Sequence, residues 1–296
     1  MSAIRITRAG PLATLQDAGR PGLLRHGISA SGPMDGAAFA RAGGWLGAAG
    51  TTAIEFTTAG LSFVAEGSVS VAVDGGAFEL SIDGEAKSWP ARALLGAGSV
   101  VDIRPGPAGN YGYLRLDREI EVPLVMGSRA TSSIAGIGGF GGRALRAGDL
   151  LPLGATLPRG RGQHPTPAEV ADGPIRIVWG IHADRFDNAI RQRFVTDGFA
   201  VSSQLDRMGV RLGDPSQVFA DAKILSLVSD AVVPGDIQIL GDGTPIVLMR
   251  DHQPTGGYPR IATVVTADLD RFAQLRPGNQ VRFVPVTVQH AEGLKP

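Results

Sequence analysis

Four segments of the chain carry more polar and glycine residues than a packed core needs, and they hold the best candidates for chemistry. They span residues 14–27, 29–35, 202–211 and 250–259. The last is the densest, because acidic, amide, hydroxyl and phenol side chains surround a glycine pair between two apolar runs. A hairpin needs only a few turn residues at such a point, so the excess favours a functional loop. The candidates there are Asp251, Gln253, Thr255, Gly256, Gly257 and Tyr258.

The segment 202–211 combines an acid with two arginines. Asp206 and Arg207 are adjacent, and Arg211 follows four residues later. A guanidinium holds a carboxylate or phosphoryl group through two parallel hydrogen bonds. Arg207 and Arg211 are therefore candidate anion contacts, with Asp206 expected to orient Arg207. The alternative, which stays open, is a surface ion pair on a loop.

The two N-terminal segments add four further candidates. Asp17 and Arg20 belong to the first, and Ser31 and Asp35 belong to the second, directly before a predicted helix. Ser31 or Asp35 either caps that helix or belongs to a helix N-terminus whose free N–H groups bind an anion. The glycine pair of segment 250–259 offers a second kind of anion site, a nest of consecutive backbone N–H groups.

Composition excludes several classes of function. Lys+Arg and Asp+Glu are 28 each, whereas nucleic acids and anionic membranes call for a basic surface. The chain has no cysteine and five scattered histidines, so we expect neither disulfides nor a metal site. Residues 136–143 are glycine-rich but lack the Gly-Lys-Ser/Thr ending of a P-loop. With no membrane-length apolar run and no signal-peptide pattern, we expect a cytoplasmic protein.

The elements that position these candidates are mostly strands. Short apolar or alternating runs separated by turn residues predict a mainly β chain with few short helices. The 42 glycines and 20 prolines are typical of many turns between strands. Strands are predicted over 4–7, 61–65, 69–73, 100–104, 111–116, 175–179, 224–228, 237–240, 245–249, 261–265 and 281–284, hairpin tips at 82–85 and 241–244, and helices over 35–46, 184–194 and 268–275.

Residues 158–174 are rich in proline, glycine and polar residues, which is typical of an exposed linker. We therefore predict two β-rich subdomains, residues 1–160 and 172–290.

Six motifs in a fixed order carry a resemblance to a known family. They are Leu15-Gln16-Asp17-x-Gly-Arg20-Pro21-Gly22, Ser31-Gly32-x-Met34-Asp35, Gly127-Ser128-Arg129, Gly138-Gly139-Phe140-x-Gly142-Arg143, Asp206-Arg207-Met208-Gly209-x-Arg211 and Thr255-Gly256-Gly257-Tyr258-Pro259. Together they resemble the biotin-dependent carboxyltransferase C-domain family over about residues 4–285. That family includes the C-subunit of 5-oxoprolinase, the KipI antagonist and the C-terminal half of the urea carboxylase carboxyltransferase domain.

The resemblance implies a cyclophilin-like β-barrel, clearest in the C-terminal subdomain. It also implies partners: a KipI-like N-domain half and a further 5-oxoprolinase subunit. The arrangement is most similar to 5-oxoprolinase, in which ATP, bound at the level of the complex, drives opening of the small amide substrate 5-oxoproline to glutamate. A hypothesis that fits is Asp251 as acid/base, with Gln253, Thr255 and Tyr258 positioning the substrate. Asp17 and Arg20 would serve the cleft or the partner interface.

Two alternatives remain open at this point. One is carboxyl transfer from biotin to urea or a related amide, in which case biotin would be a cofactor. The other is a non-catalytic regulator that binds a KipI-like partner. The residues quoted above are compatible with all three.

Overall fold

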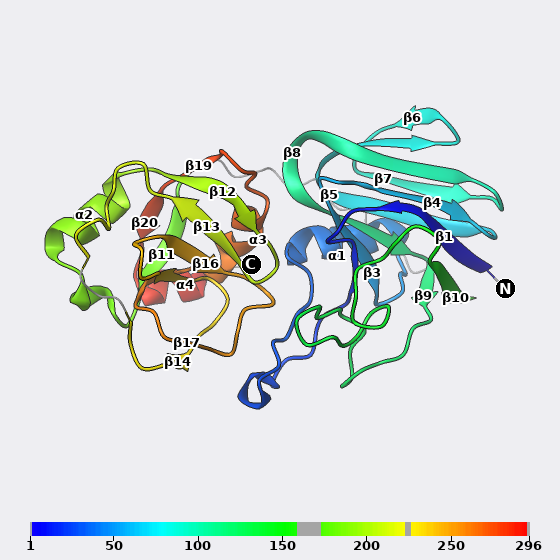
Figure 1. Cartoon of the computed structure of the whole chain (residues 1–296). Coiled ribbons are helices and arrows are strands. Elements are labelled where there is room, and N and C mark those ends of the chain that lie inside the picture. The colour runs from blue at the N-terminus through cyan, green and yellow to red at the C-terminus, as the bar shows by residue number, and fades with distance from the viewer. Residues whose placement is uncertain (1, 159–172, 223–225, 295–296) are drawn as a thin grey trace. The chain divides into compact units, whose positions relative to one another are not determined.

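The computed structural model describes residues 2–158, 173–222 and 226–294 and divides into two compact units (Figure 1). The first unit contains residues 1–21 and 30–169, and the second contains residues 22–29 and 170–296. The linker predicted over 158–174 lies mainly outside the described residues. Segment 22–29, which the sequence analysis placed in the N-terminal subdomain, belongs to the second unit.

The first unit is built on a ten-stranded antiparallel sheet that curls into a half-barrel. The order along its main path is β2-β3-β8-β4-β1-β10-β9, and β5 pairs with β6, β7 and β8. The strands are β1 (Ser2–Ala9), β2 (Thr14–Gln16), β3 (Ala53–Thr57), β4 (Leu61–Ala65), β5 (Val69–Ile82), β6 (Glu85–Lys87), β7 (Ala91–Leu95), β8 (Val100–Leu116), β9 (Arg118–Ile120) and β10 (Leu150–Thr156).

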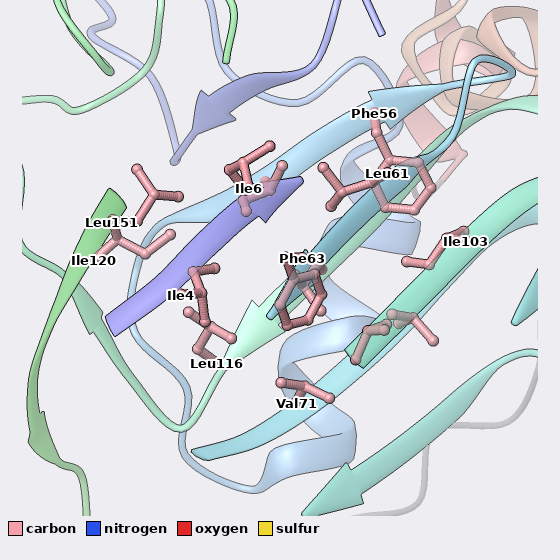
Figure 2. Close-up of a cluster of buried hydrophobic side chains, with 14 of the residues drawn as sticks. Ile4, Ile6, Phe56, Leu61, Phe63, Val71, Ile103, Leu116, Ile120 and Leu151 are labelled. Atoms are coloured by element: carbon pink, nitrogen blue, oxygen red, sulfur yellow. The ribbon is translucent and has the colours of Figure 1, made fainter. Parts of the chain in front are cut away.

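The core of this unit follows from strand alternation. Side chains on a strand point alternately to opposite faces, so Ile4 and Ile6 of β1 enter the core together. Ile6 pairs in register with Phe63 of β4, and Leu61 of β4 pairs with Ile103 of β8. All five side chains are fully buried and lie in one cluster (Figure 2).

Helix α1 (Gly36–Leu46) packs on β5 and β8 of this sheet and is held by polar contacts. Arg41 Nη2 lies 2.8 Å from Asp74 Oδ1 on β5, and Trp45 Nε1 donates to Asp74 Oδ2 at 3.2 Å. The Arg115 guanidinium of β8 lies 4.1 Å from the centre of the Phe39 ring. Helix α1 is thereby held against the sheet.

The second unit holds an eight-stranded sheet that forms a nearly closed barrel. Its order is β19-β12-β13-β16-β15-β18-β11-β20, with β11 and β20 parallel. The strands are β11 (Ile175–Trp179), β12 (Phe199–Leu205), β13 (Gly209–Gly213), β15 (Asp236–Ile239), β16 (Pro245–Leu248), β18 (Arg260–Val264), β19 (Gln280–Val281) and β20 (Phe283–Pro285), and a separate pair joins β14 (Asp230–Ala231) to β17 (Thr255–Gly256).

Helices and aromatic rings complete the second unit. The helices are α2 (Asn188–Thr196), α3 (Thr266–Ala273) and α4 (Val288–Gly293). Phe194 of α2 stacks on Phe283 of β20, with ring centres 5.0 Å apart, and packs on Phe199 at 5.6 Å. Helix α3 is tied to β11, because Asp268 accepts from Arg176 Nη2 at 2.5 Å. These contacts hold α2 and α3 against strands of the barrel.

The mainly β fold is confirmed, and its deviations have local causes. The runs predicted as strands 100–104 and 111–116 join into the single 17-residue strand β8, because it pairs with the 14-residue β5. The helix predicted over 184–194 is wrong in its start. A 3₁₀ turn occupies Ala183–Arg185, and α2 begins only at Asn188.

Three further differences concern the C-terminal half. The run predicted as strand 281–284 is divided between β19 and β20, and the sequence analysis missed α4. The strand predicted over 224–228 lies partly outside the described residues, and 226–228 are not in a strand.

No helix in the described part of the chain combines the length and apolar character needed to cross a bilayer.

Candidate functional site

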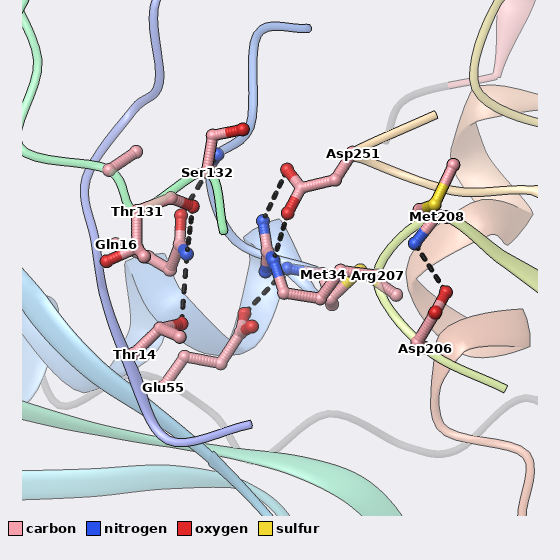
Figure 3. Close-up of polar contacts among 12 residues, drawn as sticks. Thr14, Gln16, Met34, Glu55, Thr131, Ser132, Asp206, Arg207, Met208 and Asp251 are labelled. Atoms are coloured by element: carbon pink, nitrogen blue, oxygen red, sulfur yellow. Dashed lines mark hydrogen bonds and ion pairs between the residues drawn. The ribbon is translucent and has the colours of Figure 1, made fainter. Parts of the chain in front are cut away.

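Asp206 holds the turn between β12 and β13. Its Oδ1 accepts from the backbone N–H of Met208 at 2.7 Å (Figure 3). It also accepts from the backbone N–H of Gly209 at 3.1 Å. Its own N–H donates to the Gly209 carbonyl at 3.1 Å. The expected role of orienting Arg207 is therefore not what its contacts show, because an aspartate at a tight turn satisfies nearby backbone donors first.

Arg207 is oriented by Asp251 instead. Arg207 Nε donates to Asp251 Oδ2 at 2.8 Å and Nη2 donates to Oδ1 at 3.2 Å (Figure 3). The two side chains are only 5% and 1% exposed. Asp251 N–H also donates to the Arg207 carbonyl at 2.7 Å. Both carboxylate oxygens are thus engaged by one guanidinium, which favours a positioning role for Asp251, and its acid/base role stays a prediction.

A pocket of about 580 Å³ is lined by four of the predicted residues, Asp206, Arg211, Gln253 and Tyr258, but by neither Arg207 nor Asp251. A neighbouring pocket of about 710 Å³ shares Arg211 with it. Arg211 is exposed, and no ion pair or hydrogen bond of its guanidinium is found among the described residues. An unpaired guanidinium lining two pockets suits an anionic ligand.

Sequence reasoning missed Gln238, which also lines the 580 Å³ pocket. It is 1% exposed on β15 and lies between the core residues Ile237 and Ile239. Gln253 Nε2 donates to Gln238 Oε1 at 3.5 Å. Gln238 Nε2 has no hydrogen-bond partner in the described part of the chain. The signal was an amide inside an apolar strand, which buries a polar group at a cost.

The glycine pair does not form the expected anion nest. A nest needs a residue in the left-handed region, and neither Gly256 nor Gly257 has a positive φ. Thr255 is exposed and forms β17 with Gly256. A Cβ at position 256 would lie 2.3 Å from Gln238 Nε2. Gly256 is therefore needed for close packing against the buried glutamine.

In the first unit, Asp17 and Arg20 bind the protein itself. Asp17 Oδ1 accepts from Gly19 N–H at 2.8 Å and Ser128 Oγ at 2.5 Å, and its Oδ2 accepts from Arg129 N–H at 2.6 Å. The Arg20 guanidinium donates to the Ala130 carbonyl. These motif residues join distant loops of one unit, and their substrate-binding role stays a prediction.

Asp35 is the N-cap of α1, because its Oδ1 accepts from Ala38 N–H at 2.8 Å. Ser31 is buried with φ of 56° and a hydroxyl that has no hydrogen-bond partner among the described residues. The sequence analysis left open whether this segment caps the helix or binds an anion at its N-terminus; Asp35 caps the helix.

Glu55 is a second residue that the sequence analysis missed. It is fully buried and accepts from Met34 N–H and Tyr113 Oη, both at 2.8 Å (Figure 3 shows Glu55 and Met34). Tyr113 Oη in turn accepts from Asp35 N–H at 2.8 Å. Burial raises the pKa of Tyr113 well above its ordinary value, and the Glu55 carboxylate adds to the shift. This network fixes the start of α1 on β3 and β8.

The sequence matches the carboxyltransferase domain, subdomain A and B, over residues 26–285. The chain belongs to this family. It is 35% identical to the C-subunit of 5-oxoprolinase from Escherichia coli over 97% of the chain and 93% of that protein. It is 33% identical to the corresponding C-subunit from Haemophilus influenzae over 96% of the chain and 91% of that protein.

Fused relatives in the family are much longer. Urea amidolyase of Saccharomyces cerevisiae is 30% identical over 99% of the chain, which spans 17% of that protein. The crystal structure of the Kluyveromyces lactis urea amidolyase superimposes with a TM-score of 0.88 at 26% identity, over 98% of the chain and 19% of that chain. The fold described above is thus that of a carboxyltransferase domain.

In the glycine-rich loop 136–143 of this carboxyltransferase domain, three backbone N–H groups donate to carbonyls of the same unit. Gly139 N–H donates to the Arg129 carbonyl at 2.7 Å, and Gly142 N–H donates to the Gly138 carbonyl at 2.7 Å. Ile137 N–H donates to the Ser132 carbonyl at 3.1 Å. A phosphate cradle needs such groups to be free, so this loop does not fit one.

Proposed function

We propose that this chain is a subunit of an ATP-dependent 5-oxoprolinase, which opens the lactam of 5-oxo-L-proline to give L-glutamate. The observation that carries the proposal is the match to the C-subunit of the Escherichia coli 5-oxoprolinase, at 35% identity over 97% of the chain and 93% of that relative. The partners in this proposal are a KipI-like carboxyltransferase half and a further subunit of the complex.

The 580 Å³ pocket supports a small amide substrate. A lactam carries a carbonyl acceptor and an N–H donor, and Gln253 and Tyr258 line the pocket with groups that can bind both. The substrate also carries a carboxylate, for which the exposed guanidinium of Arg211 is the natural contact. In this proposal the buried Arg207–Asp251 pair is a rigid base for the loop that carries Gln253.

ATP belongs to this proposal at the level of the complex. Loop 136–143 of this chain does not fit a nucleotide, because Ile137, Gly139 and Gly142 donate their N–H groups to carbonyls of the same unit. We therefore place nucleotide binding on a partner subunit. The role left for this chain is to bind and orient the amide.

The test is ATP hydrolysis by the chain copurified with its partner subunits, with and without 5-oxoproline. We expect 5-oxoproline to stimulate ATP hydrolysis and the amount of glutamate formed to equal the amount of ATP hydrolysed in response. The partner subunits without this chain are the control and should show no stimulation. A stable complex with no stimulation would contradict the proposal.

A second candidate is favoured by the urea amidolyase relatives, one of which matches 99% of the chain. In it the chain contributes to carboxyl transfer between biotin and urea. The ureido ring of biotin presents adjacent N–H and C=O groups, so it suits the same amide-lined pocket. Urea-dependent consumption of bicarbonate and ATP in the presence of a biotin carboxylase and a biotinylated carrier, in place of glutamate formation, would support this candidate.

A further inference from the structure

An exposed arm of the second unit, residues 226–231, runs along residues 254–257 of the candidate loop. At one end, the Leu227 N–H donates to the Gly257 carbonyl at 2.7 Å. Towards the other end, β14 of the arm pairs with β17 of the loop (Figure 1). Five of the six residues of the arm are exposed, and an isolated two-stranded pairing is at best marginally stable in water. The position of the arm therefore depends on contacts beyond this pairing.

Arg260, at the start of β18, provides such a contact. Its Nη2 donates to Asp230 Oδ2 of the arm at 2.7 Å, and its Nη1 donates to Asp236 Oδ2 of β15 at 3.3 Å. One guanidinium thus bridges a carboxylate that is 57% exposed and a carboxylate that is 3% exposed. The rigid, planar fork of an arginine suits a bridge of this kind.

The end of the bridge that lies in the barrel is well held. The backbone N–H of Arg260 donates to His182 Nδ1 at 3.2 Å, and the side chain of Arg260 is 11% exposed. Asp236 accepts in addition from Thr263 Oγ1 at 2.7 Å and from the Val233 N–H at 3.0 Å. The bridge therefore fixes the exposed arm to the barrel.

Two side chains of the 580 Å³ pocket lie at the ends of segment 254–257, Gln253 before it and Tyr258 after it. We propose that Arg260 is a positioning residue for this pocket. By holding the arm against segment 254–257, it sets where Gln253 and Tyr258 meet a ligand. Arg260 is not among the residues that line the pocket, so it acts through the arm. The inference rests on the proposed function, which assigns this pocket to the substrate.

The first test measures amide hydrogen exchange in the full chain by NMR. The reporter is Leu227, whose N–H donates to the Gly257 carbonyl. Asp230→Asn removes the exposed carboxylate from the bridge, so the arm should open more often and Leu227 should exchange about 5-fold faster. The Val264 N–H, which donates to the Gly235 carbonyl in the barrel at 2.8 Å, should exchange as in the wild type. Unchanged exchange at Leu227 overturns the proposal.

The second test measures KM and kcat of the assembled complex for 5-oxoproline with Arg260→Gln, which removes the whole bridge. Even a shift of about 1 Å in a binding wall is costly, so KM should rise about 10-fold while kcat changes less than about 2-fold. A bridge that served stability alone would lower the folded fraction, and with it the apparent kcat, at an unchanged KM. Arg260→Lys keeps the charge and should recover part of the wild-type KM. An unchanged KM in a folded Arg260→Gln complex overturns the proposal.

Asp197→Asn is the matched control for both tests. It breaks another partly exposed ion pair of the second unit, Arg193–Asp197 at 3.4 Å, where α2 ends. Neither residue lines the 580 Å³ pocket, so exchange at Leu227 and the KM should both stay as in the wild type. An equal response to Asp197→Asn would mean that the loss of any such charge disturbs the pocket, and it would overturn the role of Arg260.

These tests are separate from that of the proposed function. A complex without stimulation by 5-oxoproline would lose the 5-oxoprolinase assignment, whereas faster exchange at Leu227 in Asp230→Asn would still support Arg260 as the anchor of the arm. A stimulated complex whose KM does not respond to Arg260→Gln would lose the role of Arg260 alone.

Discussion

Each unit contains a buried polar cluster beside segments that the sequence analysis predicted to bind substrate, and the two clusters differ in how well they are satisfied. In the first unit, Asp17 accepts three hydrogen bonds and Glu55 accepts two. In the second unit, the buried Gln238 keeps an unpartnered Nε2, and the exposed Arg211, which lines the same pocket, forms no ion pair among the described residues. A satisfied cluster stabilises a fold, whereas an exposed cation that lines a pocket without an ion pair is available to a ligand.

The largest expected effect is on the buried ion pair that underlies the second site. Asp251→Ala removes the carboxylate that accepts from Nε and Nη2 of Arg207, whose side chain is 5% exposed. Breaking such a pair by removing one partner costs about 3–5 kcal/mol. We expect that loss in the free energy of unfolding, measured by denaturant titration of the chain.

The matched control is the surface pair Arg5–Glu66, whose side chains are 47% and 36% exposed. Glu66→Ala should cost only about 0–1 kcal/mol, because exposed ion pairs are screened by water. If Asp251→Ala costs no more than this control, the buried pair is not the support of the loop. Loss of turnover with full stability would instead restore the acid/base assignment of Asp251.

Asp17→Ala tests the claim that the first cluster is structural. It removes the acceptor of three hydrogen bonds, which Gly19, Ser128 and Arg129 donate. Hydrogen bonds to a charged group contribute about 1.5–3 kcal/mol each, and not additively. We expect a destabilisation of about 3 kcal/mol, with an unchanged KM for 5-oxoproline in the fraction that stays folded. A raised KM at unchanged stability would make Asp17 a ligand contact.

Part of this fold could be predicted from the sequence, because the period of apolar residues indicates a strand, but β3, β10, β12 and β13 were not among the predicted strands. The runs 61–65 and 175–179 coincide with β4 and β11. The predictions that failed needed tertiary information. Residues 105–110 extend β8 only because β5 lies alongside them, and the helix predicted from residue 184 begins at Asn188.

The candidate site was predictable in its segments and less so in its roles. Arg211, Gln253 and Tyr258 do line one pocket. The partner of Arg207 was assigned to its neighbour Asp206, but the structure gives it to Asp251, 44 residues away. Gln238 lies in a run of apolar residues, so the sequence offered no reason to select it. Its distinguishing feature is the missing hydrogen-bond partner of Nε2, which only the structure shows. Spacing along the chain carries no information on an absent contact.

Arg211→Ala tests whether the pocket of the second unit binds the carboxylate of the substrate. Arg211 has no ion pair among the described residues, so the free energy of unfolding should change by less than about 0.5 kcal/mol. The loss of its contact to the substrate carboxylate should raise the KM for 5-oxoproline about 10-fold or more. The affinity for 2-pyrrolidinone, which lacks a carboxylate, is the internal control and should not change. Equal losses for both ligands would contradict carboxylate recognition.

The smallest expected effect concerns pH and the second unit alone. Burial lowers the pKa of His252 below its ordinary value, against the opposing Gln253 carbonyl, which lies 2.6 Å from Nδ1, and the Asp236 and Asp251 carboxylates. Because the folded state binds the proton less readily than the unfolded state, stability should be complete above the unfolded pKa of about 6.5. It should fall as the pH drops from there towards the lowered pKa, by less than about 1.4 kcal/mol per pH unit.

His252→Gln should flatten that dependence in denaturant titrations between pH 7 and 5, since it removes one group that the unfolded chain protonates first. His182, whose pKa burial also lowers, would account for a remaining slope of the same sign. His26→Gln, at an exposed position, is the control and should leave the slope as in the wild type. An unchanged slope in His252→Gln would mean that the loop carrying Gln253 admits water and is not closed over the histidine. The same result would weaken the contrast between the two clusters, because the pocket wall would then be solvated in the free protein.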